Sequence, residues 1–112
     1  MDSTRQKKIG RLIQKEMSEI LQREVRDIVM GTMVSVTITR ISPDMSMAKV
    51  YLSIFPTTNR DDVFKSITQN SSKLRFLLGQ RVGKQLRVIP DLQFFIDDSL
   101  DYAQKIDDLL KK

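Results

Sequence analysis

The sequence predicts an α+β fold whose elements follow in the order α-β-β-α-α-β. Apolar residues recur every three or four positions near the N-terminus and again over residues 60–87, which is the period of one helix face. In the stretches 32–41, 46–55 and 92–97, apolar and polar residues alternate, which is the period of a strand. Because 112 residues suffice for one modest core and not for two, we expect a single domain over residues 1–112.

The first expected helix runs from about Thr4 to Arg26, with Ser3 or Thr4 as its N-cap. Its apolar stripe is Ile9, Leu12, Ile13, Met17, Ile20 and Leu21. The basic residues on the opposite face are Lys8, Arg11 and Lys15. These three residues either bind a polyanion or form the solvated outer face of an ordinary core helix.

A β-hairpin is expected next. Its first strand spans Thr32 to Ile41 and its second spans Ser46 to Phe55, with a proline-containing turn between them. The side chains expected to face the core are Val34, Val36 and Ile38 in the first strand, and Ala48, Val50, Leu52 and Ile54 in the second.

The second helix begins after Asn59, a suitable N-cap, and its apolar side is Val63, Phe64 and Ile67. Asp61 and Asp62 in its first turn suit the positive end of the helix dipole better than a metal site. At Asn70-Ser71-Ser72 the pattern breaks. We expect Asn70 to end this helix in a left-handed conformation, and Ser71 or Ser72 to cap the next one. One continuous helix from Arg60 to Leu86 remains the alternative.

The stretch Lys73–Ser99 combines a basic helix with a buried strand. Helical geometry places Lys73, Gln80, Lys84 and Arg87 on one flank with Phe76 beside them, while Arg75 and Arg81 lie elsewhere on the helix. Ile89-Pro90 ends this helix. In the strand that follows, the side chains expected in the core are Leu92, Phe94 and Ile96. An acidic tail from about residue 99, short and helical or frayed, completes the chain.

Composition excludes several classes of function. With no cysteine and no histidine, the chain has no disulfide, no serine–histidine triad and no ordinary zinc site. A metal-dependent hydrolase using Asp44, Asp61, Asp62 or Asp97 remains a weaker alternative, and we expect no enzyme activity, cofactor or small-molecule substrate. No apolar run reaches the roughly 20 residues that span a bilayer, and neither basic helix has the aromatic belt of membrane-surface helices. We therefore expect a cytoplasmic protein without a membrane partner.

A net charge of +5 and a pI near 9.7 favour a polyanionic partner such as nucleic acid. The candidate RNA-binding residues are Lys8, Arg11, Lys15, Lys73, Arg75, Arg81, Lys84 and Arg87. A protein-interaction module using the sheet or the acidic tail is the alternative of a different class.

The element order is that of a type II KH domain, and the chain resembles ribosome-binding factor A, a bacterial family, over about Lys7 to Leu110. The matching stretches are Glu16 with Ile20–Asp27, Ser42-Pro43-Asp44, Ala48–Tyr51, Leu74-Arg75, Leu78-Gly79, Arg87–Leu92 and Phe94–Leu100. In this order and at these spacings they are specific.

This resemblance implies a three-stranded mixed sheet with the helices on one face. It also implies a monomer that binds immature small (30S) ribosomal subunits and their 16S rRNA in the neck and decoding region, and that assists late maturation and rRNA processing, especially in the cold. KH domains clamp RNA with a GxxG loop, and the family has an Ala-x-Gly kink there. Here Asn70-Ser71-Ser72 stands instead, and we carry no binding role to these residues.

Overall fold

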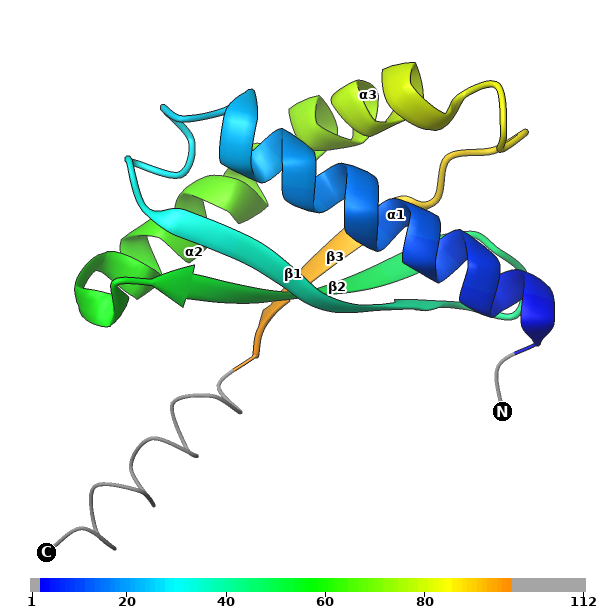
Figure 1. Ribbon diagram of the computed structural model, residues 1–112, viewed down its shortest axis with the longest axis horizontal. Coiled ribbons are helices and arrows are strands. Elements are labelled where there is room, and N and C mark those ends of the chain that lie inside the picture. The colour runs from blue at the N-terminus through cyan, green and yellow to red at the C-terminus, as the bar shows by residue number, and fades with distance from the viewer. Residues whose placement is uncertain (1–2, 98–112) are drawn as a thin grey trace, which may run out of the picture.

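A computed structural model describes residues 3–97 of the chain (Figure 1). Its helices are α1 (Thr4–Arg23), a short 3₁₀ turn (Thr57–Asn59), α2 (Arg60–Gln69) and α3 (Ser71–Val82), and its strands are β1 (Met33–Ile41), β2 (Met47–Phe55) and β3 (Asp91–Ile96). The predicted order α-β-β-α-α-β is confirmed. The expected acidic tail lies outside the described residues.

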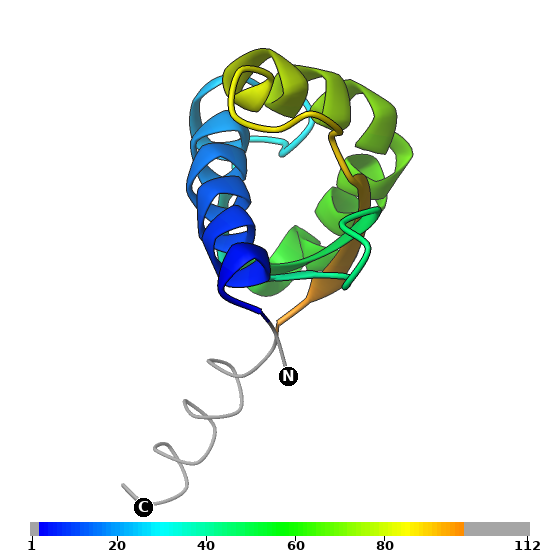
Figure 2. The ribbon, with the colours of Figure 1, turned by 90° about the vertical axis from the view of Figure 1, so that its right-hand side faces the viewer.

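The sheet is mixed and has the order β1-β2-β3. β1 pairs with β2 antiparallel, and β3 pairs with β2 parallel, because the chain crosses over through α2 and α3 before it returns. All three helices lie on the same side of the sheet (Figures 1 and 2). This is the α+β, KH-like arrangement that the resemblance implies.

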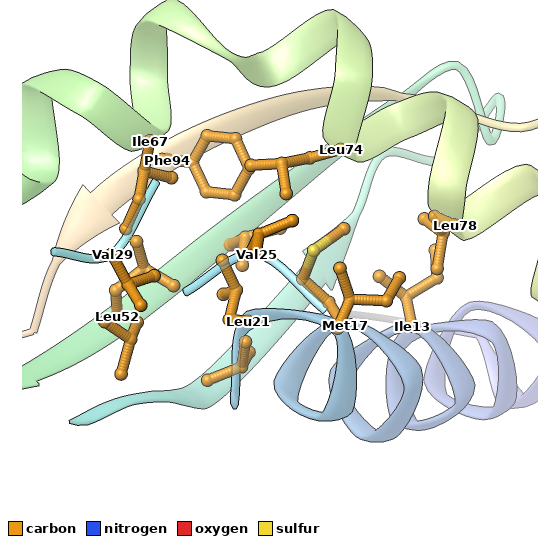
Figure 3. Close-up of a cluster of buried hydrophobic side chains, with 14 of the residues drawn as sticks. Ile13, Met17, Leu21, Val25, Val29, Leu52, Ile67, Leu74, Leu78 and Phe94 are labelled. Carbon is orange, nitrogen blue, oxygen red and sulfur yellow. The ribbon is translucent and has the colours of Figure 1, made fainter. Parts of the chain in front are cut away.

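One buried cluster joins the inner face of the sheet to the helices (Figure 3). The expected stripe of α1 and the inward residues of β2 are part of it or pack against it. Phe94, 7% exposed, is the buried residue of β3, and Figure 3 shows it near Ile67 of α2 and Leu74 of α3. Leu92 and Ile96 are partly buried against the same cluster, so the predicted core face of this strand is confirmed.

The expectation that Ile38 faces the core is wrong. The register of β1 against β2 shifts between Val36 and Ile38, where Thr37 forms a β-bulge. The extra residue reverses the alternation, so that Ile38 stands opposite Tyr51 on the outer face and is 39% exposed. Ile41 takes the inward position instead and is buried.

Helix α1 covers the free edge of β1, and it packs so closely at Gly10 that a Cβ there would lie 2.9 Å from the carbonyl oxygen of Thr39. Side chains of α1 bond the edge. Gln6 is buried and donates to the carbonyl of Ile41 (2.8 Å), and Gln14 donates to the carbonyl of Thr37 (3.2 Å). The hydroxyl of Ser18 accepts from the amide of Val36 (3.0 Å). These bonds satisfy polar groups that an edge strand leaves unpaired.

Helix α1 begins as predicted and ends earlier than predicted. The hydroxyl of Ser3 accepts from the amide of Gln6 (3.1 Å), and the side chain of Gln6 accepts from the amide of Ser3 (2.8 Å), which is a complete capping box. The helix ends at Arg23 rather than Arg26, because the chain then turns so that Val25, together with Ile28 and Val29, enters the core.

The junction of α2 and α3 keeps the predicted break but not its predicted chemistry. Asn70 ends α2, yet its φ is −103° rather than left-handed, and its side-chain amide donates to the carbonyl of Ser66 (2.8 Å). Ser71 and Ser72 are the first residues of α3, whose N-cap position is Asn70, and no side chain makes a cap hydrogen bond there. Asn59 likewise makes no side-chain cap bond at α2. The alternative of one continuous helix is wrong.

Helix α3 ends at Val82, so the basic helix is shorter than predicted. The amides of Gln85 and Leu86 both turn back to the carbonyl of Val82 (2.8 and 2.9 Å). This turn partly buries Leu86 and Ile89 against the core and starts the return to β3, whose first amide, that of Asp91, donates to the carbonyl of Ser46 (2.9 Å). We call residues 83–90 the return loop. In the described part of the chain, no helix has the length and apolar character to cross a membrane.

Candidate nucleic-acid interface

The N-terminal half of α1 carries five basic side chains and no acidic one. Lys8, Arg11 and Lys15 are exposed, as predicted, and Arg5 and Lys7 are exposed beside them. No acidic residue occurs between Ser3 and Lys15, and none of these five cations is ion-paired with a residue in the range 3–97. Their charge is therefore available to a ligand, although Lys15 also interacts electrostatically with Glu19, four residues on.

Arg81, another predicted contact, is instead occupied within the protein. Its guanidinium lies 2.9 Å from the carboxylate of Glu16, 2.7 Å from that of Glu19 and 3.3 Å from that of Glu24. The hydrogen bond from Arg81 lowers the pKa of Glu19, and the bonds to Glu16 and Glu19 raise the pKa of Arg81. This residue ties α3 to the C-terminal half of α1, and its charge is compensated.

Arg75 is also held, by backbone carbonyls of the return loop. Its Nη2 donates to the carbonyl of Ile89 (2.6 Å) and its Nε to that of Pro90 (3.2 Å), with the carboxylate of Asp91 at 3.5 Å. These bonds fasten the return loop to α3. The side chain remains 45% exposed, so it contributes charge to the surface while its donors are largely used.

Lys73, Lys84 and Arg87 are exposed and have no ion pair with any described residue. Lys73 lies in the first turn of α3, as predicted. Lys84 and Arg87 are not on the helix, because α3 ends at Val82, so the prediction that they share a helical flank with Lys73 is wrong. Both lie in the return loop.

Two grooves meet at the return loop. One, of about 670 Å³, lies between α1 and this loop, and we call it the α1 groove; its lining includes Arg5, Lys8 and Arg87. The other, of about 700 Å³, lies between α3 and the same loop, and we call it the α3 groove; it includes Phe76 and Arg87. Arg87 and Val88 line both, so the two grooves adjoin at these residues.

Among the described residues, Asp44 is the one carboxylate that lines the α1 groove. Its Oδ1 accepts from the hydroxyls of Ser42 (2.7 Å) and Ser46 (2.8 Å) and from the amide of Ser46 (3.1 Å). These hydrogen bonds lower the pKa of Asp44 to about 2. The carboxylate thus closes the β1–β2 turn, a role that needs no ligand.

Sequence reasoning missed several basic residues at this surface. Lys7 and Arg11 line a further hollow of about 250 Å³ together with Arg40 of β1. The strand neighbour of Arg40 is Lys49, which is also exposed. Helical spacing within α1 could have identified Arg5 and Lys7, whereas Arg40 becomes a neighbour of α1 only through the fold.

Comparison with known proteins identifies relatives along the whole chain. The family model described as ribosome-binding factor A matches residues 5–110. Ribosome-binding factor A from Cytophaga hutchinsonii is 45% identical over 112 residues, which cover 100% of this chain and 84% of that protein. The Flavobacterium johnsoniae protein of the same name is 48% identical over 111 residues, covering 98% and 85%.

Solved structures with the same fold carry the same family name. The crystal structure of ribosome-binding factor A from Thermus thermophilus has a TM-score of 0.67 at 20% identity, and covers 81% of this chain and 94% of that one. A Thermus thermophilus homology model fitted into a cryo-EM map of a 30S–RbfA complex has a TM-score of 0.60 at 20% identity, covering 78% and 89%. The match over residues 5–110 shows that the chain belongs to the ribosome-binding factor A family.

Proposed function

We propose that this protein binds immature small ribosomal subunits through their 16S rRNA and assists late maturation and rRNA processing, most importantly in the cold. Residues 1–112 act as one KH-like RNA-binding domain, as a monomer in the cytoplasm. The protein has no catalytic activity and acts by occupying or reshaping rRNA. Membership of the family supports the partner, and the exposed basic surface supports the mode of contact.

The observation that carries the proposal is the uncompensated charge around the α1 groove. Lys8 on α1 and Arg87 in the return loop line one groove without an ion pair among the described residues, although they are 79 positions apart in sequence (87 − 8). A row of cations on a rigid scaffold is what the RNA phosphate backbone attracts, since binding releases condensed counterions. Lys84 and Lys73 extend this surface over the return loop and α3.

Co-sedimentation tests the partner directly. Immature small subunits from a strain lacking the protein, mature small subunits and complete ribosomes are each incubated with the purified chain at low salt and pelleted. We expect binding to the immature subunits and weaker binding to complete ribosomes. Equal binding to all three would contradict a maturation role.

The deletion strain tests the cellular role. We expect slow growth and incompletely processed small-subunit rRNA at low temperature, with both defects smaller at high temperature. Normal subunit profiles in the cold would contradict the proposal.

One observation favours a second candidate, a protein-interaction module. Met33 and Phe55 stand opposite each other on β1 and β2 and are both 66% exposed on the outer face of the sheet. Exposed apolar pairs of this kind occur at protein-binding sites. Ribonuclease treatment separates the two candidates, because it abolishes capture through RNA and leaves capture through the sheet unchanged.

A further inference from the structure

Phe76 is an exposed aromatic side chain on α3, a helix whose other face packs in the core. Leu74, Leu78 and Val82 of α3 are completely buried, whereas Phe76 is 65% exposed. Across the α3 groove, Val88 of the return loop is 68% exposed. Leaving two large apolar side chains in water forgoes stabilisation that their burial would supply, so their position needs another explanation.

The α3 groove has a shape and a lining that suit a flat ring. Gly79 lines it together with Phe76 and Val88, and a Cβ added there would meet Cγ1 of Ile89 at 3.4 Å, so the helix backbone packs closely on the return loop. Gln80 adds an exposed amide to the lining. The return loop that forms the far wall is fastened to α3 by the bonds from Arg75 to the carbonyls of Ile89 and Pro90. The groove is therefore preformed rather than dependent on a ligand for its shape.

The positive charge around this groove favours a flat ligand that also carries phosphate. Arg75 and Arg87 line it, and no carboxylate of residues 3–97 does. Arg87 also lines the α1 groove, where Arg5 and Lys8 add further positive charge. An RNA strand whose phosphates follow the α1 groove would thus pass Arg87 with its next base beside Phe76.

We propose that the α3 groove binds one unpaired nucleobase, whose ring stacks on Phe76 while Arg87 contacts an adjacent phosphate. Gln80 is placed to hydrogen-bond the edge of that base. The inference rests on the proposed function and adds to it a contact that does not depend on salt, because stacking on an aromatic ring is not an electrostatic contact with phosphate. Such stacking accepts any base. The structure therefore assigns to Phe76 a preference for single-stranded over paired RNA.

The chain contains no tryptophan, so Phe76→Trp introduces a single fluorescent reporter into the groove. Phe55→Trp is the matched control, because Phe55 is 66% exposed and lies at the end of β2, outside the α3 groove. We expect a short oligoadenylate to quench the indole of F76W and not that of F55W. An abasic oligomer of the same length, which has the phosphates without the bases, should quench neither.

Affinity for immature small subunits supplies the second readout. Phe76→Leu should weaken binding by about 5- to 100-fold, the loss expected for one stacked base, without changing the slope of log affinity against log salt. Met30→Leu, at a residue that is 53% exposed and lines neither groove, should bind as wild type does. Thermal melting of each variant shows whether its fold is intact.

The outcomes separate this inference from the proposed function. If wild type binds subunits and F76L binds equally well, the nucleobase site is wrong while the proposed function stands. If F76L weakens subunit binding but oligoadenylate does not quench F76W, the groove binds a protein and the inference is overturned. If wild type binds neither RNA nor subunits, the proposed function is wrong and the nucleobase site with it.

Discussion

The two halves of α1 carry charge in opposite ways. From Thr4 to Lys15 every charged side chain is basic and exposed, and none pairs with a described residue. From Glu16 onward the carboxylates of the helix, joined by its C-cap residue Glu24, gather around Arg81. The same helix thus carries exposed, unpaired charge at one end and ion-paired charge at the other, and we propose that the first binds RNA.

This contrast teaches that a count of basic residues does not locate a binding surface. Lys8 and Arg81 have the same formal charge, but the field of Arg81 is cancelled within the protein, whereas the field of Lys8 extends into solvent. The variants below test whether the two ends are as independent as the geometry indicates.

The largest expected effect comes from the core that supports both ends. Replacing Phe94 with alanine removes a 7%-exposed ring from the cluster beneath α2 and α3. We expect the free energy of unfolding to fall by roughly 3–5 kcal/mol. Chemical denaturation measures it, and an unchanged transition would show that β3 does not present this face to the helices.

Replacing Arg81, whose charge is compensated, should lower stability without changing the affinity for RNA. Arg81→Met leaves three carboxylates without their shared cation, and we expect a loss of about 1 kcal/mol, the scale of a partly exposed ion-pair network. Arg81→Lys keeps the charge but lacks the planar guanidinium, so its stability should lie between those of wild type and Arg81→Met. Affinity for RNA should stay within about twofold in both variants, since the guanidinium of Arg81 is already paired with three carboxylates. A large affinity loss in a folded Arg81→Met variant would place Arg81 at the interface after all.

Substitution of the two serines at the start of α3 should be tolerated, whereas substitution of a capping residue would destabilise the helix. Because Ser71 and Ser72 are helical residues without cap bonds, replacing both with alanine should raise the free energy of unfolding by a few tenths of a kcal/mol per site, roughly the propensity difference. A loss of about 1 kcal/mol would indicate a cap that the geometry does not contain. Asn70→Ala, which removes the bond to the carbonyl of Ser66, is the informative contrast and should destabilise.

The smallest expected effect concerns how stability depends on pH at Asp44, in the β1–β2 turn. Asp44 has a folded pKa of about 2, below its ordinary value of 3.8, so its contribution to stability is complete above about pH 4 and is lost as pH falls toward 2. In wild type, stability should therefore decrease over this interval more steeply than in Asp44→Asn. Denaturation curves collected at several acidic pH values measure the difference, and parallel curves would show that the turn does not depend on the carboxylate.

Much of this fold follows from local patterns in the sequence. The 3.6-residue period of α1, the alternation in β2 and the proline before β3 each act over a few residues. All three elements form over those patterns, although α1 ends at Arg23 rather than at Arg26. The bulge at Thr37 is different, because it depends on how two strands align, and it moved Ile38 out of the core.

The candidate site was less predictable, for a physical reason. Whether a cation is available depends on carboxylates that the fold brings to it, and Glu16 is 65 residues from Arg81 in sequence. Lys84 and Arg87 were assigned to a helix because helical spacing extends beyond Val82, whereas the chain must leave the helix there to reach β3. Both the pairing of Arg81 and the end of α3 depend on tertiary constraints that no local period encodes.

The salt dependence of binding tests the central claim most directly. Affinity for immature small subunits is measured between about 50 and 200 mM salt for wild type, for the triple variant Lys8→Gln, Arg11→Gln, Lys15→Gln, and for Arg81→Met. With about six phosphate contacts, wild type should lose roughly a thousandfold in affinity over this range.

For the triple variant, the slope of log affinity against log salt should be shallower by about 2–3, roughly one per contact removed, with an unchanged melting temperature. Arg81→Met should keep the wild-type slope while melting lower. Equal slopes in wild type and the triple variant, or a slope change in Arg81→Met alone, would contradict the division of α1 into a binding half and a structural half.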